Sequence, residues 1–173
     1  MGWIERHRLL AFQGRSRKPQ IQKAAEFSIT RYPAPGGGCL LTEKRFAGRL
    51  KDLIEDRPDP SREELEMLKL GRHFRLSPDS RLVVGRNKRE NDALASLASF
   101  EDRVLAAAGI PGPLAVLSGT PDQGEMETAL AITLAYSDSQ DIEKCPVTIS
   151  YRGVKTEVLT PVLDKQVFSS MLI

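Results

Sequence analysis

The stretch RHFRLSPDSRLVVGR, residues 72–86, decides the fold class because the residue pattern changes there from helical to alternating spacing. Polar and apolar residues alternate in RHFRL (72–76) and in RLVVGR (81–86), as in strands that bury one face. The segment between them, SPDS (77–80), consists of four residues that favour turns. The sequence therefore predicts a β-hairpin that begins directly after Gly71.

Helices and strands alternate after this hairpin. We expect a long helix with Asn87 as its N-cap and Glu90 completing a capping box. A strand over 113–118, a helix over 123–137 and a second hairpin over 146–159 should follow. This ββαβαββ order predicts an α+β fold, in which a mainly antiparallel sheet packs with helices. The apolar residues expected on the buried face of the long helix are Leu94, Leu97, Phe100 and Leu105.

Residues 1–67 have helical rather than alternating spacing. We expect four helices there, the last of which begins at a capping box formed by Ser61 and Glu64. This predicts two parts, a helical region with a Gly-rich loop over 1–67 and a domain over 68–173. The residues expected to be buried are Trp3, Ile4, Leu9 and Leu10 in the first helix, Ile21, Ala24, Ala25 and Phe27 in the second (19–27), and Phe46, Leu50, Leu53 and Ile54 in the third (43–56).

The composition excludes several classes of protein. Of the 173 residues, 40% are hydrophobic and 28% are charged, which is enough to bury a core. No apolar run approaches the roughly 20 residues that span a bilayer, and the N-terminus lacks the apolar region of a signal peptide, so we expect a cytoplasmic protein that binds no membrane. Two cysteines and two histidines show neither a disulfide framework nor zinc-ligand spacing, so we expect no metal.

Charge is unevenly distributed along the chain. Residues 1–18 contain five basic residues and one acidic residue, a charge of +4. Residues 71–90 contain six basic and two acidic residues, which is also a charge of +4. Residues 91–144 carry two basic and nine acidic side chains, a charge of −7. This asymmetry predicts a polyanionic partner on one side, unless the charges are merely solvated surface. The candidate phosphate contacts are Arg15, Arg17, Lys18, Arg72, Arg75, Arg86, Lys88 and Arg89.

The stretch PAPGGGCLLTEKRF, residues 33–46, places three glycines directly before Cys39. Glycine lets a substrate approach the backbone closely, and Thr42 can cap a helix that starts at Glu43. A cysteine just before a helix N-terminus is stabilised as the nucleophilic thiolate. Cys39 is therefore a candidate catalytic residue, and the alternative is that it is a buried residue in a Gly-rich turn. Cys145, which precedes an apolar strand, is expected at a sheet margin without such activation.

SRLVVGRNKREND, residues 80–92, resembles the hairpin strand and following helix start of the NFACT-R type RNA-binding domain. GIPGPLAVLSG, EMETALAITLAYSDS and PVTISYRGVKTEVL follow in the order of that domain's Pro-Gly step, Ala-rich helix and terminal hairpin. The resemblance covers about 68–165 and implies an RNA-binding domain. Where the family usually has Ser-His and lysines, this chain has Pro113-Leu114 and Thr156-Glu157.

GRSRKPQ (14–20) and PAPGGGCLLTEKRFAGRLKDLI (33–54) resemble parts of bacterial tRNA-thiolation proteins that carry an ATP-pyrophosphatase (PP-loop) module. The resemblance implies that Cys39 takes part in sulfur transfer, with tRNA and a sulfur-donor protein as partners. The Ser-Gly-Gly-x-Asp-Ser motif of the ATP site is absent, so we expect no cofactor on this chain and ATP only in an upstream domain.

Three functions follow from these patterns. The first is an RNA-binding part of a tRNA-modifying, thiouridylase-like protein, in which Cys39 carries sulfur and the basic segments hold the RNA backbone. The second is a protein-interaction module that uses the acidic residues 91–144, with Cys39 as an inert structural residue. The third is a thiol-dependent enzyme in its own right.

Overall fold

The computed structural model describes residues 5, 10, 12–14, 16–32, 39–139 and 142–173. By their contacts, the residues form two units, Met1–Cys39 and Leu40–Ile173. The division predicted at residues 67 and 68 follows the change from helical to alternating spacing, whereas the contacts group 40–67 with the sheet. No helix within the described ranges is long and apolar enough to cross a membrane.

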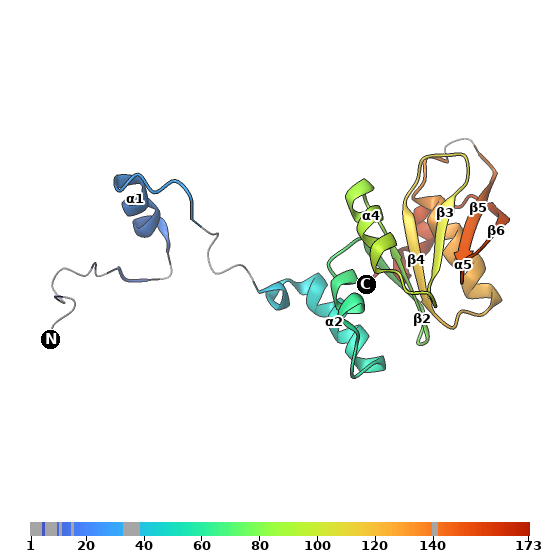
Figure 1. Cartoon of the computed structure of the whole chain (residues 1–173), viewed down its shortest axis with the longest axis horizontal. Coiled ribbons are helices and arrows are strands. Elements are labelled where there is room, and N and C mark those ends of the chain that lie inside the picture. The colour runs from blue at the N-terminus through green and yellow to red at the C-terminus, as the bar shows by residue number, and fades with distance from the viewer. Residues whose placement is uncertain (1–4, 6–9, 11, 15, 33–38, 140–141) are drawn as a thin grey trace. The chain divides into compact units, whose positions relative to one another are not determined.

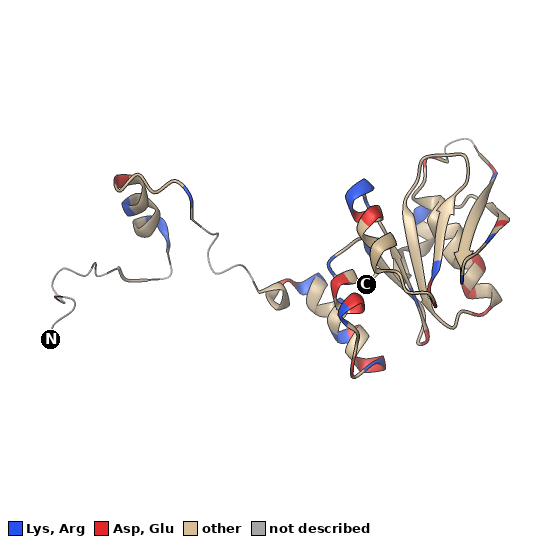
Figure 2. Cartoon of the chain, in the orientation of Figure 1, with Lys and Arg blue, Asp and Glu red and all other residues tan. Residues whose placement is uncertain are grey.

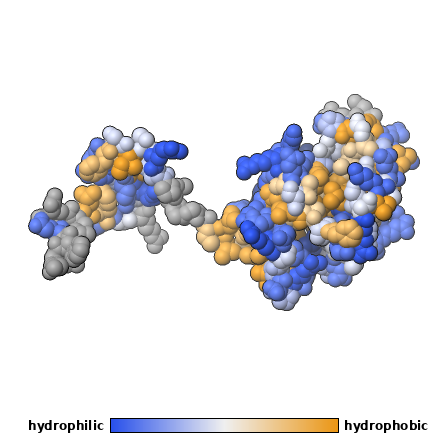
Figure 3. Space-filling model, in the orientation of Figure 1, coloured by the Kyte–Doolittle hydropathy of each residue, from blue (hydrophilic) through white to orange (hydrophobic). Residues whose placement is uncertain are grey.

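The first unit contains the helix α1, Lys18–Glu26, which starts with a proline in its first turn as predicted. No residue of α1 is buried, and Ile21 and Phe27 are 45% and 66% exposed, so the predicted burial of the apolar stripe is wrong. Apolar side chains accordingly lie on the surface of this unit (Figure 3). A nine-residue helix can bury its stripe only against another element. Trp3, Ile4 and Leu9 of the first predicted helix, Arg15 and the glycines 36–38 lie outside the described residues. Leu10 is described and is 57% exposed, so its predicted burial is wrong.

The second unit contains all the described strands (Figure 1). They form one six-stranded sheet in the order β1-β2-β4-β3-β5-β6, and every neighbouring pair is antiparallel. The predicted α+β class and both predicted hairpins are confirmed. The elements are η2 (Leu40–Thr42), α2 (Lys44–Asp56), α3 (Arg62–Met67), β1 (Arg72–Ser77), β2 (Ser80–Val84), α4 (Lys88–Leu97), β3 (Arg103–Ala107), β4 (Leu114–Gly119), α5 (Gln123–Ala135), β5 (Lys144–Tyr151), β6 (Val154–Pro161) and η3 (Lys165–Met171).

Alternation along the central strands builds a separate core on each face of the sheet. On β2, Leu82 and Val84 point to the face that α5 covers, where they join the largest group of buried apolar side chains. Val83, between them, points to the opposite face and packs with Leu94 of α4 and with Met67. The sheet therefore separates α5 from α4 (Figure 1).

Strand β3 was not predicted, and the expected long helix is wrong beyond Leu97. Helix α4 ends at Leu97, Phe100 lies in the following turn and is 68% exposed, and Leu105 is fully buried on β3. Leucine and alanine in this stretch favour a helix. β3 instead pairs with β4 on one side and β5 on the other, and these pairings override the local preference.

Helices α2 and α3 precede the sheet and agree largely with the prediction. Ser61 and the Glu64 side chain form the predicted capping box at α3. The N-cap of α2 is Glu43 rather than Thr42, because Thr42 ends the short 3₁₀ helix η2. Phe46 and Leu53 of α2 are buried, whereas Ile54, predicted in the same stripe, is 45% exposed.

Candidate nucleic-acid interface

A cleft of about 480 Å³ lies beside the first residue of β1, where three further segments meet: the β2–α4 loop, the β3–β4 loop and the end of α5. Its walls combine cationic, aromatic and amide side chains with one carboxylate, that of Asp138. The lining residues are Arg72, Gly85, Arg86, Asn87, Lys88, Asn91, Pro111, Gly112, Pro113, Tyr136 and Asp138.

The β2–α4 loop is held in place by Glu90. Asn87 caps α4 as predicted, with its side chain accepting a hydrogen bond of 3.0 Å from the Glu90 N–H. The Glu90 carboxylate does not complete the predicted capping box. It accepts instead from the backbone N–H groups of Arg86 (2.9 Å) and Gly71 (3.2 Å) and pairs with the Arg86 guanidinium. Burial alone would raise the pKa of Glu90, but these hydrogen bonds lower it below its ordinary value.

Close backbone packing forms the opposite wall of the cleft. The N–H of Asp138 donates to the carbonyl of Pro111 at 2.8 Å, which ties the β3–β4 loop to the end of α5. A Cβ at Gly112 would lie 2.3 Å from the Ser137 hydroxyl, so glycine permits this approach. The Pro-Gly step therefore allows the loop to come close to α5.

Arg72 and Tyr136 form a stacked pair in the cleft. The guanidinium carbon of Arg72 lies 4.6 Å from the centroid of the Tyr136 ring. The Tyr136 ring in turn packs against Phe74, with 5.9 Å between the ring centroids. Because Phe74 is fully buried in the core, its contact holds the Tyr136 ring in place, and the ring in turn orients the Arg72 guanidinium.

The structure brings four of the predicted phosphate contacts together. Arg72, Arg86 and Lys88 line the cleft, and Arg89 is exposed in the first turn of α4 beside it. Figure 2 shows this basic tip of α4. Arg86 pairs with Glu90, whereas Arg72, Lys88 and Arg89 form no ion pair with any described residue. Three cations near the cleft are thus available for an anion.

The remaining candidate residues lie elsewhere. Arg75 on β1 pairs with Asp52 and Asp56 of α2, so its charge is already matched by carboxylates. Arg17 and Lys18 belong to the first unit, as does Cys39, which is exposed. Cys145 is buried in the main core, not merely at a sheet margin, and its Sγ lies 3.6 Å from the carbonyl of Ala108.

Sequence reasoning missed Tyr136, Asn91, Gly112 and Asp138 as cleft residues. Tyr136 was expected inside the helix over 123–137, whereas α5 ends at Ala135 and leaves Tyr136 as its partly buried C-cap residue. Gly112 stands in the Pro-Gly step that carried the family resemblance. Their common location became visible only when the three segments were placed in space.

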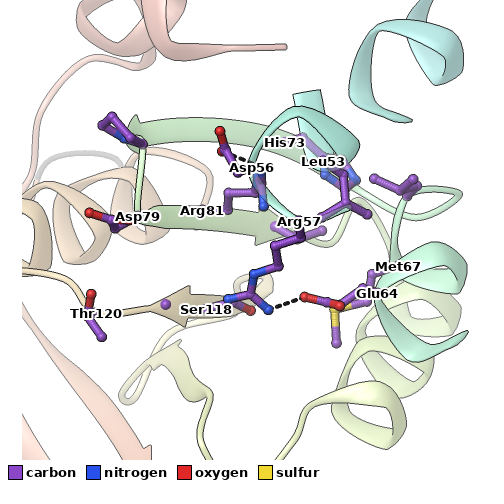
Figure 4. A pocket seen from close by; sticks show the side chains of 14 residues that line it. Leu53, Asp56, Arg57, Glu64, Met67, His73, Asp79, Arg81, Ser118 and Thr120 are labelled. Atoms are coloured by element: carbon purple, nitrogen blue, oxygen red, sulfur yellow. Dashed lines mark hydrogen bonds and ion pairs between the residues drawn. The ribbon is translucent and has the colours of Figure 1, made fainter. Parts of the chain in front are cut away.

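A second cavity, of about 300 Å³, lies between α2, α3 and the sheet (Figure 4). Arg57 pairs across it with Glu64, and Arg81 pairs with Asp52 and Asp56. Each guanidinium in its wall thus already faces a carboxylate, so this cavity attracts phosphate less than the cleft does.

His73, in the wall of the same cavity, is 5% exposed. Its Nε2 lies 2.8 Å from the carbonyl of Leu70. Burial, and secondarily the charge of Arg49, lowers the pKa of His73 to about 4. His73 is therefore neutral near pH 7 and has a structural role.

Several acidic residues of 91–144 stabilise local structure. Asp122 and Glu125 form the capping box of α5, and the Glu125 carboxylate also accepts from the Ser80 hydroxyl at 2.8 Å. Asp102 accepts from the N–H of Ser99 at 2.7 Å. These three side chains thus stabilise helix and turn ends, and the acidic docking surface over 91–144 stays a prediction.

The family described as "NFACT protein RNA binding domain" matches residues 71–169, more than half of the chain. The chain belongs to the NFACT RNA-binding domain family. The matched range contains every residue that lines the cleft and ends within η3. It begins after Cys39 and so leaves that residue outside the NFACT match.

Among the solved structures with a similar fold is that of the C-terminal part of the fibronectin/fibrinogen-binding protein from Streptococcus suis (FBPS). The TM-score is 0.50 at 18% identity, over 91% of this chain and 76% of that chain. At this identity the similarity concerns the fold alone. No curated protein matches the chain.

Proposed function

We propose that this NFACT domain binds RNA in the cleft between the β2–α4 and β3–β4 loops. The observation that carries the proposal is the meeting of unpaired cations, Arg72 and Lys88, with an aromatic ring, Tyr136, in one cleft within the family's matched range. Cations attract the phosphate backbone, and a stacking surface holds an unpaired base. The combination fits a single-stranded segment of RNA better than it fits a duplex.

Each side chain has a distinct part in this proposal. Lys88 and Arg89 lie in the first turn of the ten-residue helix α4, where the helix dipole also favours an anion, so they contact phosphates. Tyr136 covers one face of the Arg72 guanidinium, and a base stacks on the other face. The phosphate contacts contribute affinity without sequence preference.

Salt-dependent binding of labelled single-stranded RNA tests the phosphate contacts. Replacing Lys88 and Arg89 with alanine should flatten the slope of log K against log salt by about 0.7 for each lost contact on a single strand. Lys165→Ala is the matched control, because Lys165 is exposed on η3 and forms no ion pair with a described residue. An unchanged slope in the double variant would refute this assignment.

The stacking role predicts a different response. Tyr136→Leu keeps an apolar side chain on Phe74 but removes the ring beneath Arg72. Affinity should fall by about 1–3 kcal/mol, as for loss of one base stack, while the salt slope stays that of the wild type. Equal affinity of this variant and the wild type would place the bases elsewhere.

The RNA in this proposal is tRNA, and Cys39 carries sulfur to it with ATP supplied through a PP-loop module. This part is supported by the resemblance of 14–20 and 33–54 to tRNA-thiolation proteins and by the exposure of Cys39, in contrast to buried Cys145. Sulfur transfer requires a thiolate that a donor and a target can both reach.

Alkylation by iodoacetamide at a series of pH values tests the reactivity of Cys39. Mass spectrometry reads each cysteine separately, and the same chain in urea gives the rate for an unstructured thiol. Near pH 7 the folded chain should label Cys39 faster than the buried Cys145, and faster than the same thiol is labelled in urea. A rate for Cys39 no higher than in urea would leave it as an ordinary exposed cysteine and remove its role in sulfur transfer.

A further inference from the structure

The two edge strands of the sheet, β1 and β6, differ in whether their outer backbone groups have hydrogen-bond partners. Along β1, the C-terminal residues form a further bridge: Leu172 pairs with Phe74, and the N–H of Ile173 donates to the carbonyl of His73 at 2.9 Å. Along β6, residues 154–159 are all exposed. Apart from its pairing with β5, no backbone hydrogen bond among the described residues involves 154–161. An eight-residue edge of this kind presents unpaired N–H and C=O groups.

The hydrogen bonds of β5 show which residues of β6 face outward. The N–H of Val162 donates to the carbonyl of Glu143, and the N–H of Ala108 donates to the carbonyl of Pro146. Odd-numbered residues of β5 therefore bond toward β6, and even-numbered residues bond toward β3. In the β5–β6 register the odd residues face even residues of β6. The outward backbone groups consequently belong to Lys155, Glu157, Leu159 and Pro161.

A second copy of this chain can pair with β6 around a twofold axis in only a few registers, because outward residues must meet outward residues. An axis through Lys155 or Glu157 would place two like charges opposite each other. An axis through Val158 or Leu159 would require an N–H from Pro161, which has none. An axis through Thr156 places Lys155 opposite Glu157 of the second copy, twice, with four backbone hydrogen bonds.

We propose that β6 pairs antiparallel with β6 of a second copy, centred on Thr156, so that two sheets join into one. Lys155 and Glu157 form no ion pair with any described residue, so both charges are available to the second copy. Charged residues on an edge usually prevent pairing, but here the two opposite charges make the edge complementary to itself.

The apolar residues of β6 fit the same register. Val154 and Val158 lie 62% and 39% exposed on the face that α5 covers, since Val158 pairs with the buried Val147. The axis through Thr156 places Val154 of one copy opposite Val158 of the other. Apolar pairs on one face and ion pairs on the other therefore support the same arrangement.

Sedimentation velocity of the full chain, over about 10 µM to 1 mM, tests the proposal by exchanging charges. The wild type should show dimer at the upper concentrations. Lys155→Glu and Glu157→Lys should each raise the dimer dissociation constant at least tenfold. An equimolar mixture of these two variants should dimerise again, because each outward glutamate then meets a lysine. Lys165→Glu, an exposed change away from β6, should behave as the wild type.

A cysteine at the axis tests the register directly. Thr156→Cys in a Cys39→Ser background should form a disulfide-linked dimer in oxidised glutathione, because residues opposite each other at a non-hydrogen-bonded site lie within disulfide range. Lys155→Cys in the same background should form little disulfide-linked dimer, because Lys155 lies opposite Glu157 of the second copy and not opposite the second Lys155. A monomeric wild type at every concentration, dimers that persist in both single charge variants, or equal cross-linking of the two cysteine variants would each overturn the proposal.

Discussion

Asp52 is expected to hold α2 on the sheet, and Asp52→Ala tests this. The Asp52 carboxylate accepts from Arg75 at 2.6 and 3.0 Å and from Arg81 at 3.1 Å. Asp56, one turn later, pairs with the same two guanidiniums. The hydrogen bond that Asp56 accepts from Arg75, and secondarily the charges of both arginines, lower the pKa of Asp56. Two carboxylates of α2 thus neutralise one arginine from each strand of the first hairpin.

The burial of this cluster sets the size of the effect. The side chains of Asp52, Arg75 and Arg81 are 22%, 23% and 17% exposed. Exposed ion pairs contribute about 0–1 kcal/mol, whereas removing one partner of a buried pair costs about 3–5 kcal/mol. The cluster is intermediate and Asp56 remains after the substitution, so we expect a loss of about 2 kcal/mol in the free energy of unfolding. For a urea m-value of about 2 kcal/mol/M, the midpoint should fall by about 1 M.

The same helix contains a matched control. Glu55 pairs with Lys51 at 3.7 Å, and both side chains are more than half exposed. Glu55→Ala therefore removes one carboxylate from α2 without leaving a half-buried arginine, and the free energy of unfolding should change by less than about 0.5 kcal/mol. Urea unfolding followed by circular dichroism measures both variants. If Asp52→Ala were as stable as Glu55→Ala, the cluster would not hold α2 on the sheet.

Three further outcomes are expected from single positions. The pKa of His73 is 6.5 in the unfolded chain but about 4 in the folded chain. The free energy of unfolding should therefore fall by about 2 kcal/mol between pH 7 and pH 5. Urea titrations at both pH values should show that His73→Gln removes this dependence. Gly119→Ala should lower the free energy of unfolding by more than about 2 kcal/mol, since φ is +97° and the new Cβ would lie 1.8 Å from the carbonyl oxygen of Asp79. Gly153→Ala, at φ +79° in open space, should lower it by about 1 kcal/mol. Equal melting temperatures of the two variants would contradict this. Ser61→Ala should cost about 1 kcal/mol through loss of the α3 cap, and a wild-type urea midpoint would show that the cap is dispensable.

The local elements of this fold could be predicted because their determinants lie within a few residues of one another. The SPDS turn between two alternating stretches predicts the first hairpin, and the Ser61 and Glu64 spacing predicts the start of α3. Turn residues and caps act on the adjacent backbone, so their effect can be read from neighbouring letters. The same holds for Asn87 at the start of α4.

The fate of Arg75 and Glu90 could not be predicted in this way. Arg75 has the same sequence signature as Arg86 and Lys88, a basic residue near the first hairpin, yet its partners come from a helix 23 residues earlier. Glu90 has capping-box spacing, yet its carboxylate bonds to Arg86 and to Gly71, 19 residues away. Which charges remain available for RNA is therefore a property of the tertiary structure.

The sequence by itself determined the α+β class, both hairpins, three of the helix starts and the resemblance of the strand and loop motifs to an RNA-binding family. Tertiary structure alone decided that 103–107 is a strand, that α1 has no buried face, and that Arg72, Lys88 and Tyr136 share one cleft. The physical reason is the range of the interactions. Turns and caps join residues a few positions apart, whereas a strand paired on both sides, a buried face and a cleft each depend on segments that meet only when the chain has folded.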